Sequence, residues 1–266
     1  MTKDNANNDS SPNLPVPAPS RPPKSATSDE AIVSTLLPVA RAFQIYHRHE
    51  VVGLEHVPTS GRTLLVCNHS LATYDIFLLC ASIYFRHQRI VRPLIDRTFF
   101  RFPLLGDFMT YLGAVQGSPT SARELLGGEN IVCVAPGGMR ESLRPSTERY
   151  QILWEKRMGF AKLAIETGTP IVLAACPRAD DIYEVYPNPL TKWTYQFLRL
   201  PLPIARGVGL SALPRPVKLV HHLSEPIKPP KPIEGEEASK RQLRRFHERL
   251  VRRMRELIGE AIQHRI

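Results

Sequence analysis

The chain lacks a continuous apolar run long enough to cross a bilayer as a helix, which takes roughly 18–20 residues. The longest candidate, residues 76–85, is about half that length and is typical of a buried helix. The first residues also lack the apolar core of a signal peptide, so nothing in them argues for secretion. We therefore expect a cytoplasmic protein that does not span a membrane.

Cysteine is scarce, and the four cysteines lie far apart, without a CxxC pair or a histidine at zinc-finger spacing. We expect them to be reduced, buried thiols. The sequence also lacks a GxSxG elbow and a Walker loop, which leaves a serine hydrolase or a P-loop enzyme without support. Because no metal-ligand spacing is visible either, we expect neither a bound metal nor a bound cofactor.

Positive charge, in contrast, is plentiful. The 35 lysines and arginines exceed the 25 acidic residues, giving a formal net charge of +10 and a pI of about 9.7. This excess favours anionic partners in general: nucleic acid, an acidic lipid surface, a phosphorylated ligand or an acidic carrier protein. With 266 residues, 42% of them hydrophobic, the chain is long enough to bury one sizeable core.

The chain divides into a polar tail and one domain. Residues 1–28 are rich in Pro, Ser and Asn, which predicts a disordered tail, and residues 29–266 form the domain. Short apolar runs predict strands at 63–67, 90–94, 131–135, 171–175 and 217–223, and helices at 76–85, 159–166 and about 236–263. This alternation predicts an α/β fold: a single domain with a mostly parallel central sheet flanked by helices.

The last predicted helix combines an apolar stripe with seven arginines between Arg241 and Arg255. One interpretation is a terminal helix packed on the core with a solvated basic face. The other is a helix that lies on an anionic membrane surface. The stretch 193–216 mixes aromatic, Leu, Arg and Pro residues without periodicity, which predicts an irregular, partly exposed segment.

The first candidate for chemistry follows the first predicted strand, where Asn68 and His69 enter a loop and Asp75 begins the next helix. Histidine is the side chain best suited to accept a proton near neutral pH. A carboxylate a few residues on can hold one ring nitrogen as a donor, which frees the other to act as a base. The logic is that of a catalytic triad whose nucleophile is the substrate's own hydroxyl. On spacing alone, a structural histidine is the alternative.

A second cluster directly follows the predicted strand 131–135: Pro136, Gly137 and Gly138, then Arg140 and Glu141. Ligands of open α/β sheets collect at the carboxyl ends of the strands. Two glycines there let the backbone approach a ligand closely, and an arginine can hold phosphate or carboxylate oxygens. The alternative is a glycine turn with a surface arginine.

Four other histidines invite a functional interpretation that the sequence does not support. His221 and His222 lie on the last predicted strand without an acidic neighbour in the sequence, so we interpret them as structural. His47 and His49 stand among charged residues, which predicts an exposed surface.

Taken in order, these segments resemble the four motif blocks of the glycerolipid acyltransferase superfamily, over about residues 45–225. The first block is NHSLATYD, and the second ends at Gly113–Ser118. The third is VAPGGMRE, and the fourth contains Pro170. Two departures stand out: one residue more than the common spacing separates His69 from Asp75, and Gly137 replaces the usual glutamate. Both resemble the branch with a PGGxRE block, which includes type 2 diacylglycerol acyltransferase relatives and plant phytyl ester synthases.

The resemblance implies direct acyl transfer from acyl-coenzyme A or acyl carrier protein to a lipid hydroxyl, without an acyl-enzyme. His69 would remove the acceptor proton, and Asp75 would orient His69. The backbone N–H groups of Gly137 and Gly138 are candidate oxyanion donors. The expected substrate-binding residues are Asn68, Gly113, Ser118, Pro136, Gly137, Gly138, Arg140 and Glu141.

The favoured acceptor is a neutral glycerolipid or long-chain alcohol, because Gly137 removes the carboxylate typical of enzymes with phosphorylated acceptors. Lysophosphatidic acid or another lysophospholipid, held by Arg140, is the alternative. A different class of function, an inactive membrane-associated lipid-binding module, is disfavoured by the joint presence of Asn68, His69 and Asp75. Nothing resembles a nucleic-acid-binding motif. We expect peripheral attachment to an anionic membrane through residues 193–210 and the arginine-rich helix.

Overall fold

The computed structural model describes residues 26–101, 103–188 and 203–263. The predicted tail, residues 1–28, therefore lies almost entirely outside the described residues, as does most of the stretch 193–210. The first described element is a helix that begins at Ala26.

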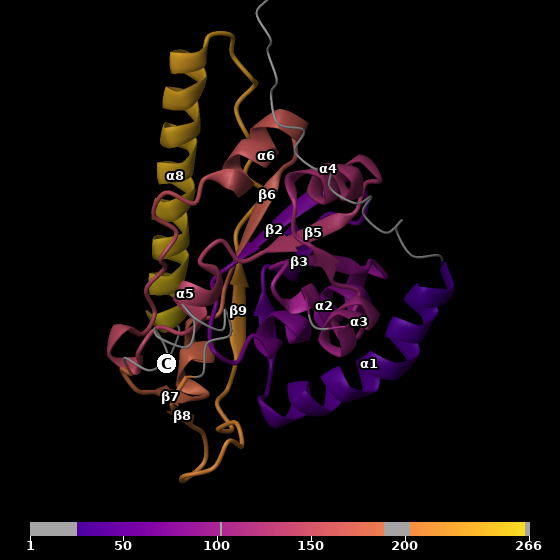
Figure 1. Cartoon of the computed structure of the whole chain (residues 1–266), viewed down its shortest axis with the longest axis vertical. Coiled ribbons are helices and arrows are strands. Elements are labelled where there is room, and N and C mark those ends of the chain that lie inside the picture. Colours follow the sequence, from indigo (N-terminus) through magenta and orange to yellow (C-terminus); the bar gives the residue numbers. More distant parts are fainter. Residues whose placement is uncertain (1–25, 102, 189–202, 264–266) are drawn as a thin grey trace, which may run out of the picture.

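A seven-stranded sheet forms the centre of the domain, with the strand order β1-β9-β6-β2-β5-β3-β4 (Figure 1). Its strands are β1 (Glu50–Val52), β2 (Thr63–Cys67), β3 (Val91–Ile95), β4 (Val115–Gln116), β5 (Ile131–Val134), β6 (Ile171–Ala175) and β9 (Val220–Leu223). All neighbouring strands are parallel except β6 and β9. This confirms the predicted α/β domain with a mostly parallel sheet. A separate antiparallel pair joins β7 (Glu184–Val185) to β8 (Ala205–Arg206).

Helices flank the sheet on both faces. They are α1 (Ala26–Tyr46), α2 (Tyr74–His87), α3 (Pro103–Tyr111), α4 (Pro119–Gly127), α5 (Gly138–Ser142), α6 (Gly159–Thr167) and α8 (Glu236–Gln263). The described residues also contain the short 3-10 helices η1 (Leu54–His56), η2 (Phe99–Arg101), η3 (Ser146–Glu148) and η4 (Pro177–Asp181). No helix of the described residues is both long and apolar enough to cross a membrane.

Side chains along β2 alternate between the two faces of the sheet and so contribute to two separate layers of the core. Leu64 and Val66 face a cluster that includes α4, α6 and α8, and Leu65 and Cys67 face a cluster that includes α2. All four side chains are buried. Because the sheet is buried on both faces, its central strands read as continuous apolar runs, which is why the sequence predicts them well.

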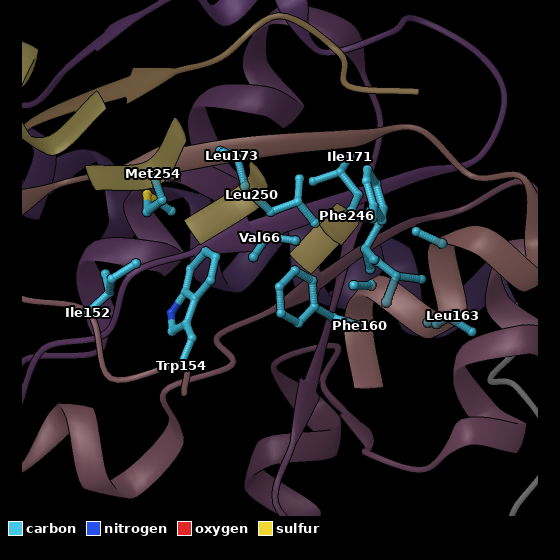
Figure 2. Packing of buried hydrophobic residues seen from close by; sticks show 14 of the residues in the cluster. Val66, Ile152, Trp154, Phe160, Leu163, Ile171, Leu173, Phe246, Leu250 and Met254 are labelled. Atoms are coloured by element: carbon cyan, nitrogen blue, oxygen red, sulfur yellow. The ribbon is translucent and has the colours of Figure 1, made fainter. Parts of the chain in front are cut away.

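The long helix α8 packs against the sheet along one side of the domain (Figure 1). Its residues Phe246, Leu250 and Met254 are buried, and Figure 2 shows them close to Ile171 and Leu173 of β6. The helix is therefore part of the core, as in the first of the two interpretations. Most of its arginines lie on the exposed side.

The topology gathers the two predicted clusters at one edge of the sheet. Strand β2 lies between β5 and β6, and the register pairs Val66 with Val134 and Cys67 with Ala174. The carboxyl ends of these three strands are consequently adjacent. The segments that follow them all begin at this edge, where ligands of such sheets bind.

Candidate active site

Asn68 fixes the start of the loop that carries His69. Its Nδ2 lies 3.4 Å from the Cys176 carbonyl oxygen, and its Oδ1 accepts a hydrogen bond from the Cys176 N–H at 2.8 Å. The side chain is only 4% exposed. These two hydrogen bonds tie the end of β2 to the end of β6, which gives Asn68 a structural role.

His69 is held through its backbone from both sides. Its N–H donates to Glu141 Oε1 at 2.7 Å, and its carbonyl oxygen lies 3.4 Å from Arg144 Nη2. The ring is half-buried, and Nδ1 has no hydrogen-bond partner. Burial lowers the pKa of His69 to about 4; the charge of Arg144 adds to this, and the Ser70 backbone opposes it. The imidazole is therefore neutral at pH 7 and able to accept a proton.

Asp75 does not form the expected pair with His69. Within the described residues no hydrogen bond or ion pair joins the two; Asp75 Oδ1 instead lies 3.5 Å from Ser70 Oγ, and Oδ2 lies 3.7 Å from His221 Nε2. Burial raises the pKa of Asp75 to about 7, and the charge of Asp180 adds to the rise.

The loop between His69 and Asp75 gives a physical reason for this difference. The loop turns tightly at Thr73, whose φ of +49° is rare for a β-branched residue. The turn leads directly into α2, so that Asp75 stands on the first turn of this helix. From there its carboxylate faces β9, a contact between distant parts of the chain that local spacing does not reveal.

The glycine turn after β5 is tightly packed. A Cβ at Gly137 would overlap the side chain of Glu141, so only glycine fits there. Gly138 has a φ of +51°, and its N–H donates to the Ala135 carbonyl oxygen at 3.0 Å. Gly138 is thus not free to donate to an oxyanion. No hydrogen bond of the Gly137 N–H occurs among the described residues, which leaves Gly137 as the candidate donor.

Glu141 points inward. It is 1% exposed, and its carboxylate accepts hydrogen bonds from the N–H groups of His69 and Leu153, each at 2.7 Å. Burial raises the pKa of Glu141, while these hydrogen bonds oppose the rise. The sequence predicts a role in substrate binding for Glu141, but both of its carboxylate oxygens accept hydrogen bonds from backbone N–H groups.

Arg144, which belongs to none of the predicted site residues, contacts the backbone of His69. It forms a buried ion pair with Asp180 at 2.5 Å and also donates to the Gln151 carbonyl oxygen. The side chains of the two charged residues are 2% and 8% exposed. The sequence does contain a signal for this ion pair. Arg144 follows β5 and Asp180 follows β6, and the carboxyl ends of these two strands lie at the same edge of the sheet.

Two other predicted residues lie on the surface of the glycine turn. Arg140 is exposed and pairs with Glu155 at 2.7 Å, so its acidic neighbour is Glu155 rather than Glu141. Pro136 accepts a hydrogen bond from Arg157 Nη1 at 3.0 Å, and the same nitrogen lies 2.6 Å from the Gly137 carbonyl oxygen. Arg157 thereby adds a second exposed cation next to the glycines.

Gly113 and Ser118 are not brought to His69. They flank β4, which β5 and β3 separate from β2 in the sheet. Gly113 ends the turn after α3 with a φ of +79°, and Ser118 caps α4 by accepting a hydrogen bond from the Ser121 N–H at 3.0 Å. Their positions are explained by local structure, and the predicted substrate contacts find no support here.

The prediction of an exposed surface for His47 and His49 is wrong. His47 is fully buried, with Nε2 2.8 Å from the Tyr74 hydroxyl, and His49 is half-buried, with Nε2 2.9 Å from His221 Nδ1. The reason is that β1 pairs with β9, which encloses the segment before β1. His221, which has no acidic neighbour in the sequence, lies close to Asp75 in space.

Comparison with known proteins places these residues in a family context. The family model "Acyltransferase" matches residues 48–176. A bovine protein named "DGAT1/2-independent enzyme synthesizing storage lipids" is 29% identical over 199 residues, which cover 74% of this chain and 57% of that protein. The human protein of the same name is also 29% identical, over 74% of this chain and 59% of its own length. The chain thus matches less than two thirds of either relative.

A solved structure shares the fold. The 1-acyl-sn-glycerophosphate (LPA) acyltransferase PlsC from Thermotoga maritima superposes with a TM-score of 0.52 and 19% identity, over 86% of this chain and 80% of that one. At this level of identity the similarity speaks for the fold alone.

Proposed function

Because residues 48–176 match the family model "Acyltransferase", we propose that this chain is a member of the glycerolipid acyltransferase superfamily and transfers a fatty acyl group from a thioester to the hydroxyl of a lipid acceptor. The observation that carries the proposal is the position of His69, whose backbone is held at the carboxyl ends of the central strands next to the glycine turn. Burial lowers the pKa of its ring, so the imidazole is neutral at pH 7. The test is to incubate the purified protein with labelled acyl-coenzyme A and a total lipid extract. Labelled lipid product supports the proposal, and its absence contradicts it.

In the proposed reaction His69 removes the proton of the acceptor hydroxyl as its oxygen attacks the thioester carbonyl. The carbonyl oxygen becomes an oxyanion, for which the Gly137 N–H is the proposed donor. The carbon–sulfur bond then breaks, and the imidazolium returns its proton to the leaving thiolate. No acyl-enzyme forms, because the nucleophile belongs to the substrate.

The residues around His69 act by holding it in place. Glu141 and Arg144 fix its N–H and carbonyl groups, which restricts the orientation of the ring. Asp75 is proposed to act on His69 indirectly, through Ser70 and the loop that joins them. The exposed guanidinium of Arg157 is proposed to attract the phosphates of the donor, which is acyl-coenzyme A or acyl carrier protein.

We expect a neutral acceptor to be preferred over lysophosphatidic acid. The reason is that Arg140 is paired with Glu155 at an exposed position and offers no buried phosphate clamp. The measurement is a competition in which diacylglycerol, monoacylglycerol, a long-chain alcohol and lysophosphatidic acid are present at equal concentration with one acyl donor. Arg140→Ala should leave the order of preference unchanged.

The matched control for this competition is Arg123→Ala, which removes another exposed arginine, paired with Glu166 at 2.8 Å. If lysophosphatidic acid is strongly preferred, and Arg140→Ala abolishes that preference while Arg123→Ala does not, the neutral acceptor is wrong. Arg140 is then the phosphate ligand.

We also propose that the protein binds anionic membranes peripherally. Leu210 and Leu213 are 91% and 66% exposed, and exposed Arg244, Arg252 and Arg255 form no ion pair within the described part of the chain. Flotation with liposomes should therefore require anionic lipid and weaken as salt rises. Replacing the three arginines with glutamate should abolish flotation.

The control for the flotation is Arg253→Ala, because Arg253 already pairs with Glu260 at 2.7 Å and should contribute little. Binding to neutral vesicles that resists high salt, and that Leu210→Ser weakens, would contradict the electrostatic mechanism and favour insertion of apolar side chains.

A further inference from the structure

Three buried polar side chains converge from distant parts of the sequence. Asp75 lies on the first turn of α2, Cys176 directly follows β6, and His221 lies on β9; their exposures are 1%, 0% and 1%. One oxygen of Asp75, the sulfur of Cys176 and one ring nitrogen of His221 all lie within 4.8 Å of one another. Their positions in the sequence explain why no metal-ligand spacing is visible there.

These three groups face one another without forming hydrogen bonds to one another. Asp75 Oδ2 is 3.7 Å from His221 Nε2, which is longer than a hydrogen bond. The Cys176 sulfur accepts hydrogen bonds from the backbone N–H groups of Ala179 and Val220, which favour its thiolate form, although burial raises the pKa of the thiol. A thiolate is the form that binds a metal ion.

The surroundings orient His221 as a ligand. His221 Nδ1 lies 2.9 Å from His49 Nε2, so one of the two rings donates to the other. When His221 Nδ1–H is the donor, His221 Nε2 carries a lone pair directed at Asp75 and Cys176. Metal-binding histidines are typically fixed in this way by a hydrogen bond from the second ring nitrogen.

The ligand chemistry is that of zinc. A thiolate, an imidazole and a carboxylate form a mixed set that suits Zn²⁺, whereas Mg²⁺ and Ca²⁺ require oxygen ligands. Zinc-to-ligand bonds of about 2.0–2.3 Å place tetrahedral ligand atoms roughly 3.4–3.6 Å apart, so the observed spacing needs only a small closure. One thiolate and one carboxylate also balance the charge of the ion, which matters in a site without solvent.

We propose that Asp75, Cys176 and His221 form a zinc site, with His49 orienting His221. Three protein ligands leave one tetrahedral position for a water molecule. The ion would fix both ends of the loop that carries His69, because Asp75 ends this loop and Asn68, at its start, is hydrogen-bonded to the backbone of Cys176. The site does not depend on the proposed acyl transfer.

The experiment measures metal content. The full chain is produced in zinc-supplemented medium, freed of loosely bound metal, and analysed by mass spectrometry for zinc. We expect about one zinc per chain, and at least about tenfold less in Cys176→Ser and in His221→Gln. Cys80→Ser is the matched control: it removes another thiol, from the same helix as Asp75 but outside the three ligands, and should retain the zinc.

Cobalt provides a second readout. Refolding in Co²⁺ should produce a sulfur-to-cobalt charge-transfer band that Cys80→Ser keeps and Cys176→Ser loses. The proposal is overturned if the wild-type chain takes up no zinc during synthesis or refolding, or if Cys80→Ser loses as much zinc as Cys176→Ser. Should Cys176→Ser fail to fold, the wild-type zinc content and His221→Gln decide. Acyl transfer is assayed separately, so zinc without activity, or activity without zinc, identifies which proposal fails.

Discussion

His69→Ala should lower acyl-transfer turnover by about a hundredfold or more, because a positioned general base typically contributes 10²–10⁴ to the rate. The substitution removes a half-buried ring whose Nδ1 has no hydrogen-bond partner, so the fold should survive. The measurement is the steady-state rate of folded protein, with circular dichroism to verify the fold. His87→Ala, at the far end of α2, is the matched control and should retain normal turnover.

The pH profile provides an independent check on the same base. Burial and Arg144 lower the pKa of His69 to about 4, and buried Glu141 and Asp180 are the other charged groups packed around it. Because only the neutral ring can accept a proton, protonation of His69 should lower kcat/KM only near pH 4. Asp75, whose pKa is raised to about 7 by burial, also titrates in this range, so the profile is recorded for Asp75→Asn as well. Near-normal turnover of His69→Ala, or a decline near the ordinary histidine pKa that persists in Asp75→Asn, contradicts the assignment.

Arg144→Met should lower the free energy of unfolding by about 3–5 kcal/mol, because it leaves the buried carboxylate of Asp180 without its cation. The measurement is chemical denaturation near neutral pH. The loss should shrink as the pH falls, because burial raises the pKa of Asp180 and Arg144 opposes this rise, so that Asp180 protonates more readily without Arg144. The folded fraction should also lose turnover, because Arg144 contacts the His69 carbonyl oxygen.

Two comparisons separate this effect from the simple loss of an arginine. Arg123→Met removes the cation of the exposed pair with Glu166 and should cost less than about 1 kcal/mol. The double variant Arg144→Met/Asp180→Asn should be more stable than Arg144→Met, because it removes the unpaired charge. If Arg144→Met is no less stable than Arg123→Met, the ion pair does not support the site.

The sequence predicts the centre of the sheet and misses its edges. The runs 63–67 and 171–175 coincide with β2 and β6 because strands buried on both faces must be apolar throughout. Strands β1 and β4 have three and two residues, too few for any periodicity to appear. The parallel sheet that these apolar runs predict also has the His69 loop and the glycine turn at one edge, because both follow the carboxyl ends of central strands.

The partners of the site residues could not be predicted in this way. Glu141 was recognised as part of the third block, but its bond to the His69 backbone depends on how α5 packs against the loop after β2. The contact of Asp75 with His221 depends on a turn at Thr73 and on the placement of β9. Such contacts join residues far apart in the chain, and single-sequence patterns carry no signal for them.

The pairing of β1 with β9 has a consequence for how the protein is made. Glu50 pairs with Val220, and β9 also pairs with β6, so β1 joins the sheet only through a strand from the far end of the chain. During synthesis β1 must wait, unpaired, until almost the whole domain has left the ribosome. The contacts that join His49, Asp75 and His221 can therefore form only in the last stage of folding. If the ribosome stalls before residue 220, the nascent chain has an open sheet edge, which promotes aggregation.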